Sequence, residues 1–415
     1  MMTTVDEARR IIRESVPRLP GRYQSLSCLQ GRVLAEDVVA PMSMPRFTNA
    51  AMDGFALRHS DIAGADPEAP VTLRVIAEVA AGTVPGEQVR PGTCVQIMTG
   101  APMPDGADTV IPFEQTSGFN TGEVEIFSVP KKGANIRHAG EEAEQGELLL
   151  NRGSVLTPGE IAVLAAFGIA GAVASDQPRI ALITVGSELR LPGEPLDGAA
   201  EIYNSNSSMM EALSRAWGIE PILLRHVPDD REALRSELSS ALASSDILVT
   251  AGGISTGEYD YVQELLREAG VIPCFWTVAQ KPGKPLYFGL TGDGRPVFAL
   301  PGNPVSAITC FIEYVVPALC LMQGRMVPEM VTALLEEPFP SDRKRHRFLP
   351  GTVREEGGRL MCGVSRKVES HMITALAGAN AIIEAPPSPE PVPAGTPVTC
   401  SLLPWQFFSS AATPS

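Results

Sequence analysis

The chain has 415 residues, of which 44% are hydrophobic and 20% are charged. This length allows two to four domains, and the apolar share is enough to bury cores, which excludes extensive disorder. Lys and Arg together number 33 against 48 Asp and Glu, for a net charge of -15. A chain of this charge repels a phosphate backbone, so nucleic acid is not expected as its main partner.

Neither a membrane segment nor a signal peptide is expected. The longest nearly unbroken apolar stretch, Ile161 to Ala174, is too short to cross a bilayer. The chain begins with the pattern VDEARRIIRESV, which is typical of a charged helix and not of a signal peptide. We therefore expect a cytoplasmic protein with no membrane partner.

Cysteine and histidine patterns give no sign of a disulfide framework or a zinc site. The 7 Cys are odd in number and scattered, without a CxxC pair. The 5 His form no HExxH pattern, and none lies three or four residues from another. Any metal is therefore expected to be a hard ion bound by oxygen.

The first predicted elements are a helix and a β module. Thr4 and Glu7 form a capping-box pattern, apolar residues follow at helical spacing, and Pro17 ends the helix. From about Leu57 to Arg137, short β-branched or alternating runs are separated by Gly and Pro turns. This pattern is typical of a small barrel or sandwich.

An alternation of strands and helices follows. A helix is predicted from the TPGE pattern at residues 157–160 to near Gly168. Beyond it, the strands RIALITV, PILLRHV, DILVTAGG and PVFALPG alternate with the helices SSMMEALSRAWG, DDREALRSELSSALA, DYVQELLREAG and NPVSAITCFIEYVVPALCLMQG. Strands alternating with helices of this length predict a parallel sheet covered on both faces.

After Gly324 the pattern returns to β structure. It contains the basic segment SDRKRHRFLPG, a strand near LMCGV and the Pro-rich stretch EAPPSPEPVPAGTPV. Because proline is excluded from central strands, we interpret the Pro-rich stretch as turns between edge strands. A small β domain of roughly eighty residues is thus expected at this end of the chain.

Ligands of open parallel sheets bind outside the carboxyl ends of the strands, so the loops there are the first candidates. Three such loops combine glycine with hydroxyl, amide or carboxylate side chains, at residues 186–188, 254–260 and 302–304. Glycine allows the backbone to approach an anion closely. Glu188, in the first loop, stands at a strand end and could ligate a metal.

The segment AGGISTGEYDY offers the densest set of polar groups. Its glycines could form a phosphate nest, its hydroxyls could donate to phosphate oxygens, and its acids could hold magnesium. These residues are, in order, Gly252, Gly253, Ser255, Thr256, Gly257, Glu258 and Asp260. The alternative is a tight turn in which Asp260 only caps the next helix. Two acids and two hydroxyls so close together favour a site.

Two further segments carry anion-binding chemistry less specifically. In LPGNPVS, Asn303 as N-cap and Pro304 as first helical residue build a helix start beside Pro301, which attracts oxyanions or is merely a good cap. In QKPGKP, Lys281 and Lys284 flank a stiff turn that suits a small dianion or is simply a solvated loop.

Some acids remain ambiguous from the pattern alone. Asp53 lies between apolar residues, so it is either a turn former or a working carboxylate. The segment at 98–112 is a hydroxyl-rich loop. The pair Asp229 and Asp230 is most simply explained as a helix cap.

The strings PRFTNAAMDGFAL, MTGAPMP with GADTVIPFE, NIRHAGEE, TVGSEL, YNSNS, AGGISTGEYDY, KPGKP and LPGNPVS occur in this order. Together they resemble the molybdopterin molybdenumtransferase (MoeA) family, whose eukaryotic relative is the carboxy-terminal domain of gephyrin. The resemblance covers nearly the whole chain. It implies an enzyme of molybdenum cofactor synthesis that inserts molybdate into the dithiolene of adenylylated molybdopterin and releases AMP with magnesium.

The resemblance also implies a multidomain α/β fold. An elongated domain would comprise residues 1–54 and 138–174, with a β module inserted at 55–137. An α/β/α molybdopterin-binding domain with a parallel-type sheet would span 175–326, and a β-barrel 327–408. Family members are homodimers, with the cleft facing the partner subunit, and a molybdopterin adenylyltransferase could donate the substrate.

The resemblance assigns roles to individual residues. Pterin phosphates and metal would be held by Gly252, Gly253, Ser255, Gly257, Asp260 and nearby Glu188. Molybdate would bind Lys281, Lys284, Ser306, Arg345 and Ser370. Asp53, Thr99 and Glu142 would reach in from the partner subunit, Glu142 as a further metal ligand.

The chain departs from the family pattern at four positions. Members often have a basic residue where this chain has Thr277, an Arg at Pro350, an Asp at Glu142 and a Gly at Glu369. The first two departures each remove a positive charge. Two alternatives stay open from sequence: a non-catalytic scaffold of the gephyrin type, and a transferase that prefers tungstate, which is nearly equal to molybdate in size and charge.

Overall fold

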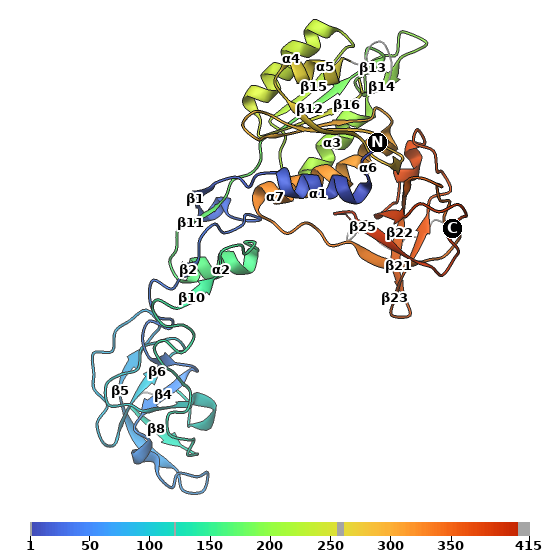
Figure 1. The fold of residues 1–415 in the computed structure, drawn as a ribbon. Helices are drawn as coiled ribbons and strands as arrows, with labels where there is room; N and C mark the ends of the chain where they lie inside the picture. The colour runs from blue at the N-terminus through green and yellow to red at the C-terminus, as the bar shows by residue number, and fades with distance from the viewer. Residues whose placement is uncertain (1, 120–121, 255–260, 406–415) are drawn as a thin grey trace. The chain divides into compact units, whose positions relative to one another are not determined.

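The computed structural model describes residues 2–119, 122–254 and 261–405. These residues fall into two compact units (Figure 1). Unit 1 contains residues 1–23, 31–35 and 173–415, and unit 2 contains residues 24–30 and 36–172. The boundaries at residues 23 and 172 fall within two strands, β1 (Gly21–Ser25) and β11 (Gly171–Ser175). The predicted division into four domains is a finer one and stays a prediction.

Unit 1 is built around a six-stranded sheet with the order β15-β12-β16-β20-β19-β17. Its strands are β12 (Ile180–Val185), β15 (Leu223–Val227), β16 (Ile247–Ala251), β17 (Ile272–Thr277), β19 (Pro285–Leu290) and β20 (Pro296–Leu300). The first four in spatial order are parallel, as predicted. β19 and β17 instead extend the sheet antiparallel, whereas the sequence analysis assigned no strand to this segment.

Helices cover both faces of this sheet, which confirms the predicted α/β/α arrangement (Figure 1). They are α1 (Val5–Ser15), α3 (Ser205–Ala216), α4 (Arg231–Ser244), α5 (Val262–Glu268), α6 (Pro304–Cys310), the π-helical η4 (Phe311–Val315) and α7 (Val316–Gln323). α4 and α5 pack on one face, and α1, α3, α6, η4 and α7 form the core on the other. All six β12 residues are buried because neighbours in sequence point into opposite cores.

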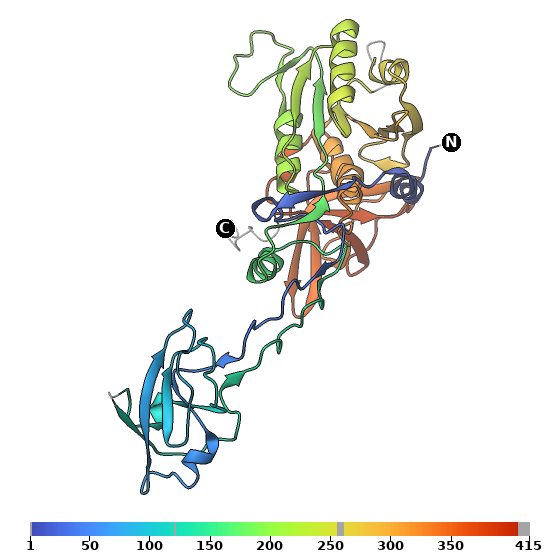
Figure 2. The same cartoon turned by 90° about the vertical axis from the view of Figure 1, so that its left-hand side faces the viewer.

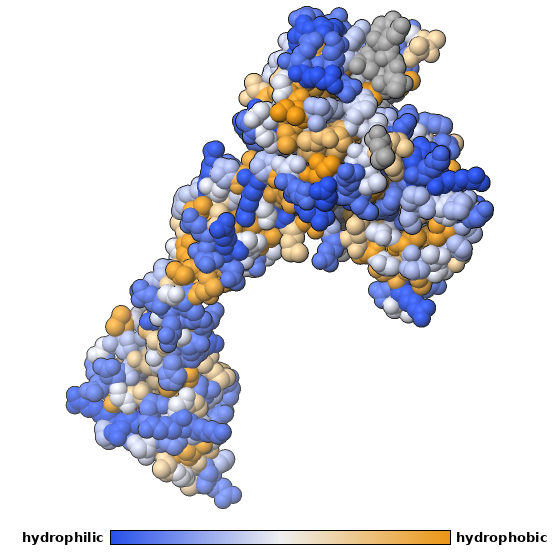
Figure 3. All heavy atoms as spheres, in the orientation of Figure 1, coloured by the Kyte–Doolittle hydropathy of each residue, from blue (hydrophilic) through white to orange (hydrophobic). Residues whose placement is uncertain are grey.

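Local signals place the helix ends. The Thr4 hydroxyl accepts a hydrogen bond from the Glu7 N–H at 3.2 Å, so the predicted start of α1 is confirmed. Asp230 caps α4 by accepting from the Ala233 N–H at 2.8 Å. Gly324 ends α7 with a φ of 67°, a conformation that favours glycine. The outer surface of α4 is hydrophilic (Figure 3) and carries ion pairs of Arg231 and Arg235 with acids of α4 and α5.

A longer apolar stretch than Ile161 to Ala174 exists in the fold, which corrects the sequence analysis. The continuous helical run from Pro304 to Gln323 is 20 residues long and apolar enough, by length and composition, to cross a membrane. However, 89% of its window is buried inside the structure. Packing within the α/β/α core therefore accounts for its apolar character.

A closed β-barrel completes unit 1. Its strands are β21 (Val331–Leu335), β22 (His346–Glu356), β23 (Arg359–Val364), β24 (Ala381–Ala385) and β25 (Pro397–Leu402). They pair in the order β22-β23-β21-β25-β24, and a β22–β24 pairing closes the ring. The Pro-rich segment connects β24 and β25 as a turn, but these are not edge strands as predicted, because each pairs on both sides. A short strand, β18 (Gln280–Lys281), pairs in parallel with the start of β22.

Unit 2 contains the predicted β module. Its five-stranded sheet has the order β7-β4-β6-β5-β8, from β4 (Gly54–Leu57), β5 (Val71–Val79), β6 (Thr93–Ile97), β7 (Thr109–Pro112) and β8 (Glu123–Ile126). Figure 2 shows the strands of this sheet. Apolar clusters pack on both of its faces. Strands β5 to β8 lie within the module predicted from about Leu57 to Arg137, and β4 ends where that module begins.

The remaining elements are short. Unit 2 also holds β2 (Val38–Val39) paired with β10 (Leu148–Leu150), β3 (Asn49–Ala50) paired with β9 (Ile136–Arg137), α2 (Pro158–Ala166), and the 3-10 turns η1 (Leu26–Cys28), η2 (His59–Ile62) and η3 (Phe113–Gln115). Unit 1 adds β13 (Leu189–Arg190), β14 (Ile202–Tyr203) and η5 (Ile373–Leu376). The predicted capping box of Thr157 and Glu160 is present at the start of α2.

Candidate functional site

A cleft of about 880 Å³ lies at the carboxyl ends of the parallel strands of unit 1. The loops after β12, β16 and β20 line it together with the start of α3 and the turn after β18. The barrel contributes Arg345 and residues 368–371. This is the edge where an α/β sheet is expected to bind ligands.

The structure brings most of the predicted site residues together in this cleft. Those that line it are Glu188, Gly252, Gly253, Lys281, Lys284, Pro301, Asn303, Pro304, Ser306, Arg345 and Ser370. Ser255, Gly257 and Asp260 lie outside the described residues. Asp53, Thr99 and Glu142 belong to unit 2.

The turn that carries the two lysines is held from below by buried polar groups. Gln280 is completely buried; its Nε2 donates to the Pro282 carbonyl at 3.2 Å, and its Oε1 accepts from the Tyr314 hydroxyl. Neither Lys281 nor Lys284 forms an ion pair with a carboxylate in the described part of the chain. The turn is thus not a loosely solvated loop, and it presents to the cleft two cations that have no ion-pair partner among the described residues.

Gly283 is required at the tip of this turn. Its φ is 84°, and a Cβ there would lie 2.6 Å from Cys310 Sγ and 2.7 Å from Gln280 Nε2, both of which are buried. No side chain larger than hydrogen fits without moving the floor of the cleft.

We expect Gly283→Ala to destabilise unit 1 by roughly 2–5 kcal/mol, from the left-handed backbone and overpacking together. Denaturant unfolding of the variant measures this. Gly294→Ala is the matched control, because Gly294 has the same φ of 84° but open space around its Cβ position. Equal losses in the two variants would show that the contacts with Cys310 and Gln280 carry no cost.

The loop after β20 is hydrogen-bonded to the barrel. Asn303 stands at the N-cap position and Pro304 is the first residue of α6, as predicted. However, the Asn303 side chain makes no capping bond; its Nδ2 donates to Ser370 Oγ at 3.1 Å. The Val305 N–H also donates to the Ser370 carbonyl, at 3.2 Å. One backbone N–H in the first turn of α6 is thus bonded to the barrel loop, and this bond holds Ser370 at the cleft.

The glycine loop after β16 is tightly packed. Gly252 and Gly253 have φ values of 95° and 66°, and a Cβ on Gly252 would lie 2.3 Å from the Val185 carbonyl oxygen. The Gly252 N–H donates to the Leu300 carbonyl at 3.0 Å, so it does not serve a phosphate nest as proposed from the sequence. The glycines are needed here because the backbones of three neighbouring strands converge.

Two carboxylates of the cleft follow strands at one end of the sheet order, whereas the lysine turn lies between β17 and β19 at the other end. Glu188 is exposed after β12 and Asp229 follows β15. Asp229 does not cap α4, which corrects the sequence interpretation: its Oδ2 accepts from the Ser187 N–H at 2.8 Å, and its own N–H donates to Ser187 Oγ. Within the described ranges, no cluster of three potential metal ligands forms.

Sequence reasoning missed further polar residues of the cleft. Asn204 caps α3 and donates to Thr184 Oγ1 at 2.7 Å, and Asn206 donates to the Gly302 carbonyl at 2.6 Å. The Oδ1 of Asn206 is buried without a hydrogen-bond partner in the described structure. The Asn-Ser-Asn pattern before a helix is a recognisable capping signal, but the contact with Gly302 depends on the fold.

Arg345 reaches the cleft from the barrel and is partly neutralised. Its guanidinium lies 2.7 Å from Asp342 Oδ2, and this hydrogen bond, with backbone N–H groups of the same turn, lowers the pKa of Asp342 to about 2. The pair fixes Arg345 at the rim.

In unit 2, Asp53 and Thr99 form a local pair. The Asp53 carboxylate accepts from the Thr99 hydroxyl at 2.6 Å and from its N–H at 2.7 Å. These bonds hold the pKa of Asp53 below its usual value. Glu142 is exposed on a turn of the same unit.

Thr99→Val is expected to raise the pKa of Asp53, because the larger of its two stabilising hydrogen bonds is lost. Carboxyl-carbon NMR titration measures the shift. Since the folded pKa lies below the unfolded one, the linked stability is present above the unfolded pKa and is lost as the pH falls through the folded pKa. Thr83→Val, a change at an exposed hydroxyl that donates to the Ala80 carbonyl, should leave the pKa of Asp53 unchanged; an equal shift in both variants would contradict the assignment.

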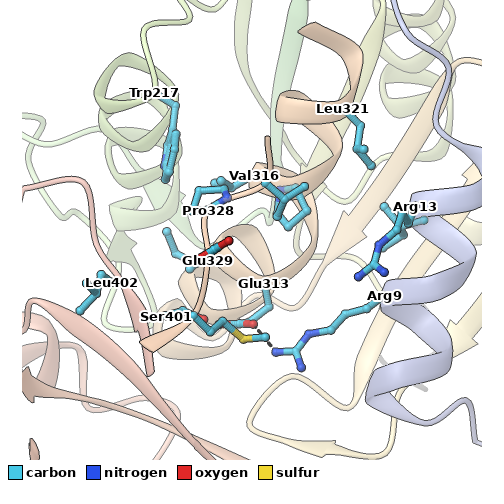
Figure 4. A pocket seen from close by; sticks show the side chains of 15 residues that line it. Arg9, Arg13, Trp217, Glu313, Val316, Leu321, Pro328, Glu329, Ser401 and Leu402 are labelled. Carbon is cyan, nitrogen blue, oxygen red and sulfur yellow. Dashed lines mark hydrogen bonds and ion pairs between the residues drawn. The ribbon is translucent and has the colours of Figure 1, made fainter. Parts of the chain in front are cut away.

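A second, smaller cavity of about 100 Å³ lies among α1, α7 and β25 (Figure 4). Arg9 of α1 points toward Glu313 at its floor, at 2.5 Å, and also pairs with Glu384 of the barrel at 2.8 Å. Glu384 in turn accepts from His346 Nδ1 at 2.8 Å. Although burial acts to raise the pKa of Glu384, the bonds from His346 and Arg9 hold it below its usual value. Arg9 thereby connects α1, the π-helical η4 and strand β24 of the barrel.

These features define a multidomain α/β protein with a cleft, carrying two lysines on a fixed turn, between an α/β/α core and a closed barrel. Three family models match it in succession: the MoeA N-terminal region (domain I and II) over residues 3–168, a probable molybdopterin binding domain over 181–320, and the MoeA C-terminal region (domain IV) over 332–403.

Curated relatives and solved structures agree. Molybdopterin molybdenumtransferase 2 of Mycobacterium tuberculosis is 34% identical over 404 residues, 95% of this chain and 98% of that one. The molybdopterin molybdenumtransferase of Staphylococcus aureus is 33% identical over 389 residues, 90% and 91% of the two chains. The crystal structure of the molybdopterin biosynthesis MoeA protein from Pyrococcus horikosii superposes with a TM-score of 0.81 at 30% identity, covering 97% of this chain and 99% of that one.

The chain belongs to the molybdopterin molybdenumtransferase (MoeA) family. The resemblance drawn from the eight motifs is thereby confirmed, and the protein is a transferase of molybdenum cofactor biosynthesis.

Proposed function

We propose that this enzyme transfers molybdenum from molybdate to the dithiolene of adenylylated molybdopterin and releases AMP. The observation that carries the proposal is the pair of lysines on a fixed turn, neither with an ion-pair partner in the described part of the chain, in a cleft of a protein whose net charge is -15. A tetrahedral dianion that meets a phosphate-bearing substrate needs such cations to offset charge repulsion.

The two sides of the cleft would bind different reactants. Lys281, Lys284 and Arg345 would bind molybdate, assisted by the hydroxyls of Ser306 and Ser370. The loop after β16 would take the phosphate end of the pterin substrate through donors other than the Gly252 N–H, which is bonded to the Leu300 carbonyl. Fixing both reactants in one cleft lowers the entropic cost of bringing them together.

We also propose magnesium as the metal. The oxygen donors Glu188 and Asp229 line the cleft and suit a hard divalent ion. Glu188 would hold the ion with Asp260, the ligand expected from sequence that lies outside the described residues. When bound, magnesium would polarise the phosphoryl oxygens as the pyrophosphate bond is broken. Glu142 stays a further candidate ligand.

The protein would work in the cytoplasm as a homodimer, in which Asp53, Thr99 and Glu142 of one subunit complete the cleft of the other. Mixing two inactive variants tests this arrangement. Asp53→Ala and Lys281→Met should be inactive alone, and co-expression should restore activity because one cleft of the mixed dimer is intact. No restoration in a verified mixed dimer would place Asp53 in the cleft of its own chain or outside catalysis. A molybdopterin adenylyltransferase would supply the substrate.

The decisive experiment measures AMP release from purified protein with adenylylated molybdopterin and magnesium, with molybdate, with tungstate, or with neither. We expect release only with an oxyanion, and faster with molybdate. Preferential release with tungstate would change the assignment to a tungsten enzyme. Binding of the substrate without release under any condition would favour a scaffold of the gephyrin type.

A further inference from the structure

Arg347 is a buried cation with almost no partners. It lies on β22, and only 6% of the residue is exposed. Its Nε is buried without a hydrogen-bond partner in the described structure. Its Nη2 donates one long bond of 3.4 Å to the Val368 carbonyl. No carboxylate of residues 2–119, 122–254 or 261–405 forms an ion pair with it. A buried charge without compensation is costly, so a compensating group is expected.

The position of Arg347 places this charge directly behind the oxyanion side of the cleft. Its backbone is the register partner of Lys281 in the β18–β22 pairing. The Val368 carbonyl that it contacts belongs to the segment 368–371, which lines the cleft. Burial lowers the pKa of Arg347, and Glu369, Asp342 and Arg345 are the charges that act on it. A guanidinium nevertheless stays protonated at neutral pH.

The charges around this side of the cleft leave a positive excess. Among the described residues that line this side of the cleft or act on Arg347, the cations are Lys281, Lys284, Arg345 and Arg347, and the acids are Asp342 and Glu369. The cations of this set outnumber its acids by two, in a chain that is otherwise strongly acidic. Without Arg347 the excess would be one.

We propose that Arg347 sets the charge preference of the oxyanion site, favouring a tetrahedral dianion over a monoanion of the same shape. It acts through its field and not by contact with the ligand, so it is a specificity determinant and not a catalytic residue. The inference rests on the proposed function, because it assumes that the cleft binds an oxyanion.

Molybdate and perrhenate separate charge from shape, since both are tetrahedral oxyanions of similar size and they differ by one charge. The Coulomb energy of an anion in the field of Arg347 is proportional to the charge of the anion. Loss of the guanidinium charge should therefore change the logarithm of the affinity twice as much for molybdate as for perrhenate. Loss of shape or of loop position should change both equally.

The test is calorimetric titration of the full-length protein with molybdate and with perrhenate. For Arg347→Gln we expect the Kd of molybdate to rise on the order of tenfold and that of perrhenate about threefold. Arg347→Lys keeps the charge and should retain most of the preference. Arg359→Gln is the matched control, because Arg359 is an exposed barrel arginine on β23; its affinities should not change.

Equal losses for the two anions in Arg347→Gln, or no loss, would overturn the proposal. If that variant does not fold, loss of the dianion preference in a folded Arg347→Lys would overturn it as well. Failure of the unmodified protein to bind either oxyanion would instead contradict the proposed function, so the two failures are distinguishable.

Discussion

Replacing Lys281 and Lys284 together by methionine should reduce molybdate-dependent AMP release at least about 10²-fold, the scale on which loss of a preorganised charge-stabilising group acts. Both lysines line the cleft without an ion-pair partner in the part of the chain that the structure describes. Methionine keeps the apolar stem and removes only the charge. The loss should appear first as a higher KM for molybdate, because the lysines meet the oxyanion before reaction.

The double variant needs a control for charge alone. Lys131→Met removes one exposed lysine of unit 2 and should leave AMP release unchanged. Calorimetric binding of molybdate separates binding from turnover. If the double variant binds molybdate as the unmodified protein does, the lysine turn is not the oxyanion site.

The largest expected effect on stability comes from Arg9. Arg9→Met should reduce the free energy of unfolding by about 3–5 kcal/mol, because it leaves the buried Glu313 without its cation and removes one of the two partners of Glu384. The side chains of Arg9, Glu313 and Glu384 are only 16%, 4% and 10% exposed, respectively. Burial already raises the pKa of Glu313, although Arg9 opposes this shift.

Arg10→Met on the same helix is the matched control. Arg10 pairs with Glu14, and both side chains are more than half exposed, at 57% and 60%. Loss of such a surface pair should cost less than about 1 kcal/mol. A double change of Arg9 and Glu313 to methionine should recover part of the loss, because an apolar pair needs no compensation. Denaturant unfolding measures all three, and an Arg9→Met variant no less stable than Arg10→Met would show that the buried network contributes nothing.

The elements that the sequence predicted correctly are those whose signals are local. A buried parallel strand such as β12 is a continuous apolar run because both its faces are covered, and the caps at Thr4, Thr157 and Asp230 are set by neighbouring residues. The residues of the lysine turn and of the loop after β20 left a solvated loop and a simple helix cap open, and only the family motifs favoured a site there.

The predictions from sequence were wrong where pairing between distant segments decides the structure. β17 and β19 contain Pro273 and Pro285 and become strands only by antiparallel pairing, β19 with β20 and β17 with β19. β24 and β25 were interpreted as edges, but closure of the barrel through β22 gives each a second neighbour. The pairing of two strands far apart in sequence leaves no local pattern to read.

The sequence by itself determined the family, the fold class and most of the residues of the cleft, because the eight motifs are runs of adjacent residues with demanding backbone or charge requirements. Tertiary structure alone decided which of these groups are available. It commits the Gly252 N–H to Leu300, turns Asn303 toward Ser370, and moves Asp229 from a cap to the rim of the cleft. It also buries the Nε of Arg347 without a hydrogen-bond partner among the described residues. The burial and the hydrogen-bond partners of a residue depend on segments tens of residues apart, so no local sequence pattern predicts them.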